Sequence, residues 1–100
     1  MGRMAAYAIS EVEVYDEEQA GRYRDLAAES ITRYGGRYLV RGAMPQVPEG
    51  EWPSGERVVI VEFPDMTRLR QWYASPEYAE ALTVRQSALG RRLLFVEGVA

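Results

Sequence analysis

Glu62 is the first residue whose position suggests chemistry. It lies near the end of the apolar segment Arg57-Val-Val-Ile-Val-Glu-Phe63, and in an extended strand its side chain shares a face with Val58 and Ile60. A carboxylate on an apolar face needs a cationic partner, or its pKa rises. Arg41, from the preceding extended segment, is the partner we expect. Such a pair could bind a polar substrate group, with Glu62 as a catalytic base. Its commoner role is a structural ion pair that holds the end of a sheet.

An aromatic cluster, Trp72-Tyr-Ala-Ser-Pro-Glu-Tyr78, is the second candidate. Its rings could line a pocket for an aromatic or apolar ligand, with Tyr78 as a further catalytic candidate. The amides after Ser75 could receive an anion. The structural alternative is a helix restart, capped by a serine and followed by proline, with the aromatic rings in the core. The candidate ligand-binding residues are Arg41, Glu62, Trp72, Tyr73, Ser75, Tyr78 and Arg85.

Arg85 falls on the apolar stripe of the second predicted helix. It could pair with Glu77, with Glu80 or with an acid of a second copy, or it could extend to solvent. The segment Glu49-Gly-Glu-Trp52 belongs to a long loop, which could act as a lid or reach a partner subunit. No carboxylate spacing in this loop supports a metal site.

The composition excludes several chemistries. The chain has no Cys, and neither His nor Lys occurs anywhere in it. A thiolate nucleophile, a Ser-His-Asp triad and a lysine Schiff base are therefore excluded. Acid–base chemistry is left to Asp, Glu and Tyr. No phosphate-binding glycine loop or dinucleotide fingerprint occurs, so we expect no cofactor.

The charge pattern argues against nucleic acid as a partner. The net charge is −3, whereas phosphate binding needs clustered positive charge. The pairs Arg68/Arg70 and Arg91/Arg92 lie among acidic residues, so we expect them on a mixed, solvated surface.

No segment reaches the roughly 20 apolar residues that span a bilayer, and residues 1–7 lack a signal-peptide core. These features predict a cytoplasmic protein without membrane contact.

Hydrophobic periodicity predicts the order strand, helix, strand, strand, helix, strand. With right-handed crossovers this order gives a ferredoxin-like βαββαβ fold of the α+β class, with a four-stranded antiparallel sheet and both helices on one face. We expect one domain over residues 1–100. The expected elements are a strand over 5–14, a helix from Asp16 to Gly35, a strand over 37–41 that continues irregularly towards 47, a strand over 57–63, a helix that begins at 64–65, restarts at 75–77 and ends at Gly90, and a strand over 92–97.

The predicted sheet is apolar on both faces. Val59 and Val61 alternate with Val58 and Ile60 in one strand, and the other strands show the same alternation. Two helices cover only one face, and a large uncovered apolar face usually marks an interface. We therefore expect a homodimer formed face to face about a two-fold axis. The alternative is that loops cover the second face.

Several segments resemble domain-of-unknown-function family 1330, which belongs to the dimeric α/β-barrel superfamily. The resemblance extends over about residues 5–98 and implies the same fold and a dimer of two sheets. It implies no reaction. Other members of the superfamily include oxygenases, isomerases and haem enzymes, and the histidine-dependent versions do not apply here. The matching segments are Tyr34-Gly-Gly-Arg-Tyr-Leu-Val-Arg-Gly42, Glu49-Gly-Glu-Trp-Pro53, Arg57-Val-Val-Ile-Val-Glu-Phe-Pro64, Trp72-Tyr-Ala-Ser-Pro-Glu-Tyr78 and Val96-Glu-Gly98.

Two functions remain open at this point. The leading hypothesis is a small-molecule-binding protein, or a cofactor-free enzyme, with its site between sheet and helices or inside the dimer. The alternative is a non-catalytic homodimeric interaction module. Single-strand nucleic-acid binding by an aromatic sheet face is opposed by the acidity of the chain.

Overall fold

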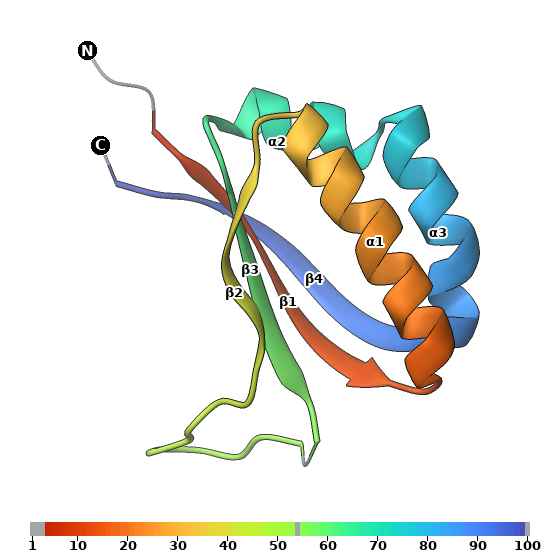
Figure 1. The fold of residues 1–100 in the computed structure, drawn as a ribbon. Coiled ribbons are helices and arrows are strands. Elements are labelled where there is room, and N and C mark those ends of the chain that lie inside the picture. Colours follow the sequence, from red (N-terminus) through yellow and green to blue (C-terminus); the bar gives the residue numbers. More distant parts are fainter. Residues whose placement is uncertain (1–3, 54, 100) are drawn as a thin grey trace.

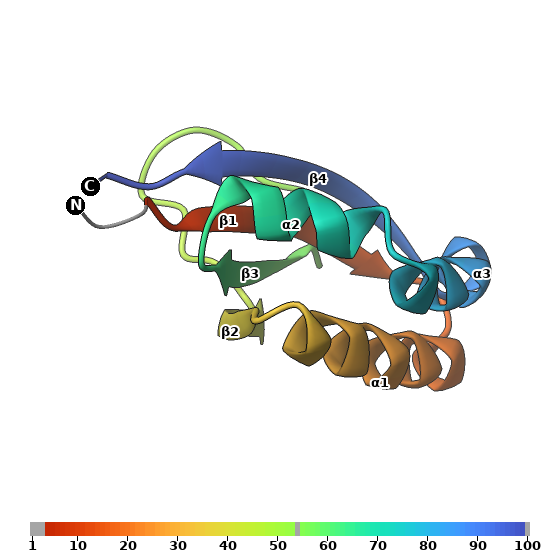
Figure 2. The ribbon, with the colours of Figure 1, turned by 90° about the horizontal axis from the view of Figure 1, so that it is seen from above.

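Strands and helices follow one another in the predicted order (Figure 1). The computed structural model describes residues 4–53 and 55–99; residues 1–3, part of the segment in which no signal peptide was expected, lie outside the described residues. Within the described residues the strands form one antiparallel sheet in the order β2-β3-β1-β4, with β2 and β4 at its edges (Figure 2). The elements are β1 (Ala6–Val14), α1 (Glu17–Arg33), β2 (Arg37–Ala43), β3 (Arg57–Phe63), α2 (Met66–Tyr73), α3 (Pro76–Ala88) and β4 (Leu89–Glu97).

Side-chain caps begin each helix where the sequence predicts them. Asp16 accepts a hydrogen bond from the Gln19 amide at 3.0 Å, and Asp65 accepts one from the Arg68 amide at 2.8 Å. Ser75 caps α3 by accepting from the Tyr78 amide at 3.1 Å. Each cap satisfies a backbone donor that the first helical turn leaves unpaired. The second helical region is therefore two helices, α2 and α3, rather than one interrupted helix.

The start of the last strand differs from the prediction. Residue 90 was expected to end a helix, but α3 ends at Ala88 and β4 begins at Leu89. Gly90 lies within the strand, where an added Cβ would collide with the Tyr15 hydroxyl. Its role is therefore to admit the Tyr15 ring against β4. The buried face of α3 shifts accordingly and consists of Tyr78, Ala81, Val84 and Ala88.

The sheet presents one face to the helices and leaves the other open. α2 contacts β1 and β3, α3 contacts β4, and α1 packs chiefly against α3. Strand parity places Ala8, Val61 and Phe95 on the helix-facing side, because these residues are direct cross-strand partners. The described buried core lies here and includes Phe63, Leu69, Trp72 and Tyr78. Two βαβ-type halves thus build one core on one side of the sheet.

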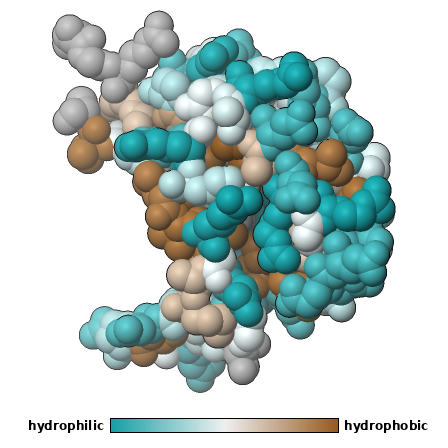
Figure 3. All heavy atoms as spheres, viewed as in Figure 1, coloured by the Kyte–Doolittle hydropathy of each residue, from teal (hydrophilic) through white to brown (hydrophobic). Residues whose placement is uncertain are grey.

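The open face carries an apolar band across all four strands of the described sheet. Leu94, Ile9 and Ile60 are in register, and Val40 continues the row on β2. Leu94 remains 54% exposed. Ion pairs border the band, Glu11 with Arg92 at one end and Glu62 with Arg37 at the other end. Figure 3 shows hydrophobic side chains gathered on the side away from the helices.

Candidate functional site

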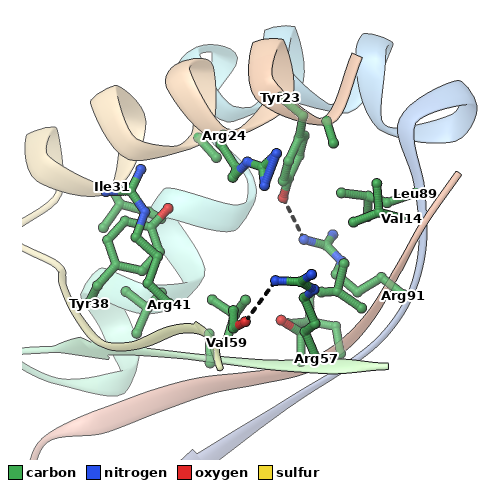
Figure 4. A pocket seen from close by; sticks show the side chains of 18 of the residues that line it. Val14, Tyr23, Arg24, Ile31, Tyr38, Arg41, Arg57, Val59, Leu89 and Arg91 are labelled. Atoms are coloured by element: carbon green, nitrogen blue, oxygen red, sulfur yellow. Dashed lines mark hydrogen bonds between the residues drawn. The ribbon is translucent and has the colours of Figure 1, made fainter. Parts of the chain in front are cut away.

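A cavity of about 120 Å³ lies between α1 and the helix-facing side of the sheet. Its walls are mainly apolar and come from α1 and from all four strands of the described sheet. In the space-filling view a hollow separates the strands from α1, with hydrophilic side chains along its rim (Figure 3). Figure 4 shows this space from close by, with side chains of sheet and helix pointing into it.

Small side chains create the cavity. The cavity-lining residues of β1 include Ala8 and Ser10, and those of α1 include Ala20 and Ala27. Short side chains on both surfaces cannot meet across the usual separation of a helix from a sheet. Because α1 is held by α3 rather than by the sheet, the gap does not close. The small residues of β1 and α1 therefore leave a space between the helix and the sheet.

One end of the cavity is polar and is built around Arg91. Its Nη1 donates to the Tyr23 hydroxyl at 2.6 Å and to the Tyr78 hydroxyl at 2.7 Å. The two hydroxyl oxygens are 2.6 Å apart. Tyr78 is completely buried and Tyr23 nearly so, whereas Arg91 is half-buried. The three groups form a closed hydrogen-bonded cluster at the meeting point of α1, α3 and β4.

Strand register gathers further positive charge at the same end. Val12 on β1 pairs with Arg57 on one side and with Arg91 on the other. Direct partners share a face, so both guanidinium groups flank Val12 beneath α1. No Asp or Glu of the described residues lines the cavity, and the arginines that do are Arg24, Arg41, Arg57 and Arg91.

The protonation states at this end are well defined. Burial raises the pKa of Tyr23, so its phenol remains protonated near neutral pH and acts as a hydrogen-bond donor rather than as a base. Arg91 is a cation at every accessible pH. Arg24 has an exposed partner, Glu17, at 3.5 Å. The polar end can therefore donate hydrogen bonds and stabilise negative charge, but it contains no group suited to removing a proton.

Glu62 lies on the open face, as its position in the strand predicts. Its partner, however, is Arg37 at 2.8 Å, and the Tyr7 hydroxyl donates to the same carboxylate at 3.1 Å. The hydrogen bonds from Arg37 and Tyr7 lower the pKa of Glu62. A base needs the opposite change, so this geometry matches an ion pair better than a proton acceptor.

The predicted pairing of Glu62 with Arg41 is wrong. Irregular pairing between β2 and β3 puts Arg41 opposite Val59, on the helix-facing side. Its guanidinium lies 4.4 Å from the centre of the Tyr38 ring and lines the cavity. The register shift on β2 therefore separates two residues that simple alternation placed together.

The aromatic cluster at the helix break is divided between different surroundings. Trp72 lines the cavity, and its indole nitrogen donates to Ser30 at 2.9 Å. Tyr78 reaches the cluster around Arg91, and Ser75 is the buried cap of α3. Tyr73 is 42% exposed and packs edge-on against Phe95. The break is thus a capped restart with core aromatics, of which Trp72 borders the cavity directly.

The remaining candidates lie away from the cavity. Arg85 is half-buried on α3, and Glu77, one of its predicted partners, instead accepts from Tyr34 at 2.8 Å and lies 4.0 Å from Arg33. The loop over residues 44–53 leads away from the helices in Figure 1, so it does not cover the cavity as a lid. The described residues contain no group of three acidic, Cys or His residues that could hold a metal ion.

Sequence reasoning missed Tyr23 and Arg91 as site residues. Tyr23 was not singled out from the sequence, and Arg91 was placed on a mixed, solvated surface. Strand parity contained a signal, because Arg91 and Leu93 alternate with Arg92 and Leu94. One arginine of the pair must therefore point to the helix side. Composition alone did not indicate which one.

The fold and the cavity define a ferredoxin-like α+β domain with an internal space between its sheet and α1. The chain belongs to a family described as "Domain of unknown function (DUF1330)", whose model matches residues 5–99. No protein in the curated comparison matches it. Among the described residues, no helix is long and apolar enough to cross a membrane.

Solved structures share this fold at low sequence identity. A protein of unknown function from Rhodopseudomonas palustris has a TM-score of 0.79 at 19% identity, covering 98% of this chain and 85% of its own. SnoaB, a cofactor-independent oxygenase from Streptomyces nogalater, has a TM-score of 0.69 at 13% identity, with coverages of 97% and 95%. A dimeric ferredoxin-like protein of unknown function from Thermobifida fusca has a TM-score of 0.66 at 12% identity, with coverages of 95% and 92%. At these identities the likeness establishes the fold.

Proposed function

We propose that this protein binds a small, mainly apolar molecule in the cavity beneath α1 and works as a homodimer joined through the open face of its sheet. The cavity carries the first part of the proposal. A tightly packed core has few voids larger than a water molecule. A space of about 120 Å³ with a polar end therefore supports a ligand site.

The size of the cavity limits the ligand. An apolar cavity of about 150 Å³ accepts a molecule the size of benzene. The cavity here is slightly smaller but is open at its rim, so a single ring or a short branched chain fits its apolar part. Such a ligand would contact Val59, Leu93 and Trp72 on the cavity walls.

A reaction on the bound molecule is the second candidate. SnoaB shares this fold and is a cofactor-independent oxygenase, so the scaffold is compatible with chemistry that needs no cofactor. Arginine and phenol groups at the polar end can stabilise charge that develops on a bound molecule. The chain without His, Cys or Lys would rely on these groups and on the chemistry of the substrate itself.

The open face supports the homodimer. Its apolar band with charged borders has the arrangement of a protein interface, with an apolar centre and a polar rim. The dimeric Thermobifida fusca protein has the same fold.

A thermal-shift screen of small metabolites tests the ligand site. The matched variant is Ala27→Leu, which fills the cavity from α1 without adding charge. Compounds that stabilise the wild type by mass action should not stabilise this variant. A compound that stabilises both proteins equally binds elsewhere. If no compound stabilises the wild type, the proposed ligand site loses its support.

Sedimentation equilibrium tests the homodimer. Leu94→Asp puts a charge in the apolar band at a position that an isolated protomer exposes. We expect a dimer for the wild type, protomers for Leu94→Asp, and a dimer for the control Thr83→Asp on the outer side of α3. A wild type that sediments as a protomer would contradict this part of the proposal.

A further inference from the structure

The hydrogen atoms of the polar cluster can be counted. The two N–H groups on Arg91 Nη1 are both used, one for each tyrosine hydroxyl. The contact between the hydroxyls of Tyr23 and Tyr78 uses one phenolic proton. One phenolic proton is left, and the described residues offer it no acceptor.

The burial of the two rings decides which proton is left. Tyr78 is completely buried and does not border the cavity, whereas Tyr23 lines it. If Tyr23 donated to Tyr78, the Tyr78 proton would be buried without an acceptor, which costs free energy. If Tyr78 donates to Tyr23, every proton inside the core is satisfied. The Tyr23 hydroxyl is then free to donate into the cavity.

The polar end of the cavity carries positive charge, which favours a negatively charged hydrogen-bond acceptor. Among the described residues, no carboxylate lies within ion-pair distance of Arg91. A half-buried guanidinium without a counter-charge is unfavourable, because burial removes part of its hydration. In Figure 4 the Arg91 and Arg57 side chains both lie below Tyr23, and strand register places the two residues on either side of Val12. A negatively charged oxygen placed there would be attracted by both guanidinium groups.

We infer that the ligand is a small molecule with an apolar body and one oxyanion, and that the oxyanion accepts hydrogen bonds from the Tyr23 hydroxyl and from Arg91. A carboxylate, an enolate and a phenolate all meet this description. The inference rests on the proposed function, because it names the ligand class for the same cavity. It assigns the apolar body to the alanine-rich wall under α1 and the charged oxygen to the arginine end.

Isothermal titration calorimetry with three probes tests the inference. Benzoate supplies a carboxylate, benzamide has nearly the same shape without the charge, and 4-nitrophenolate supplies a phenolate. We expect benzoate to bind at least about tenfold more tightly than benzamide, because hydrogen bonds to a charged acceptor are stronger than hydrogen bonds to a neutral one. A comparison of benzoate with 4-nitrophenolate then separates carboxylate from phenolate recognition.

Two variants locate the oxyanion. Tyr23→Phe keeps the ring and removes the donor, and it should weaken benzoate binding about tenfold or more while changing benzamide binding little. Arg92→Gln is the matched control for Arg91→Gln, because Arg92 is the next residue but lies on the open face with Glu11. Arg91→Gln should lower benzoate affinity and Arg92→Gln should not. Circular dichroism confirms folding, and Tyr23→Phe decides the question if Arg91→Gln does not fold.

The outcomes separate the inference from the proposed function. Equal binding of benzoate and benzamide in the wild type, abolished by Ala27→Leu, would overturn the oxyanion and leave the cavity as the ligand site. Benzoate binding that survives Tyr23→Phe and Arg91→Gln but not Arg92→Gln would move the site to the open face and overturn both. Absence of binding for all three probes would also count against both.

Discussion

Removing the Tyr78 hydroxyl is a direct test of the cluster that closes the cavity. Tyr78→Phe deletes one oxygen atom and leaves the ring in place. That oxygen lies 2.7 Å from Arg91 Nη1 and 2.6 Å from the Tyr23 hydroxyl. The ring is completely buried, so water cannot take the place of the lost hydroxyl at that position.

The expected cost follows from the two bonds. A hydrogen bond to a charged group contributes about 1.5–3 kcal/mol and a neutral one about 0.5–1.5 kcal/mol. Both former partners line the cavity, where water can recover part of the loss. We therefore expect the free energy of unfolding to fall by about 2–3 kcal/mol, near the lower end of the sum. For a domain of this size each kcal/mol lowers Tm by about 4–8 °C.

Urea denaturation, followed by the fluorescence of Trp72 and Trp52, measures this change at a fixed protomer concentration. The slope of the unfolding free energy against urea concentration should not change, because the variant exposes the same surface on unfolding. Tyr73→Phe is the control: Tyr73 is 42% exposed, and its loss of a hydroxyl should change stability by less than about 0.5 kcal/mol. If Tyr78→Phe is as stable as this control, the hydrogen bonds among Tyr23, Tyr78 and Arg91 do not stabilise the fold. The argument that the Tyr23 hydroxyl proton points into the cavity would then be wrong as well.

Further predictions concern backbone space and pH. Gly36→Ala should destabilise the fold by about 1–3 kcal/mol, because the added Cβ would lie 2.7 Å from both Ile31 and Phe63. Gly21→Ala in α1 is the control, because its Cβ would meet nothing within 4 Å, and it should stabilise the fold by about 0.5–1 kcal/mol. Thermal denaturation of the two variants tests this difference. The hydrogen bonds from Arg37 and Tyr7 hold the pKa of Glu62 below its ordinary 4.5, so its contribution to stability is present above about that pH and is lost as the pH falls through the lowered pKa. Denaturation across this pH range should show that Glu62→Gln loses less unfolding free energy than the wild type as the pH falls. Equal losses in the two proteins would contradict a role of Glu62 in this pH dependence.

The order of elements and the helix starts follow from local chemistry, which explains why the sequence predicts them well. Asp16, Asp65 and Ser75 cap helices through bonds to residues only three positions away. Such short-range signals do not depend on the rest of the fold. The boundary between α3 and β4 was predicted less well, because the position of Gly90 depends on the Tyr15 ring, which follows the end of β1.

The candidate site was harder to predict because it depends on register. Alternation along one strand places Glu62 on the open face correctly, but its pairing with Arg37 rather than Arg41 follows from irregularities between β2 and β3. The cavity itself arises from small residues on two elements that meet only in the folded chain. No spacing along the sequence shows that Ala8 and Ala27 line the same cavity.

The adjacent residues Arg91 and Arg92 point to opposite faces of the sheet. Arg91 points beneath α1 to Tyr23 and Tyr78, and Arg92 points to the open face and pairs with Glu11. The proposed ligand site and the proposed dimer interface therefore lie on opposite faces of the same sheet.

Nuclear magnetic resonance of the arginine side chains, recorded while benzoate is added, tests most directly whether the space beneath α1 is where a ligand binds. The Nε–H signal of Arg91 should move in a saturable way together with the backbone amides around Ala27, while that of Arg92 stays in place. Saturable movement at Arg92 and along the open face, with Arg91 unchanged, would contradict the account.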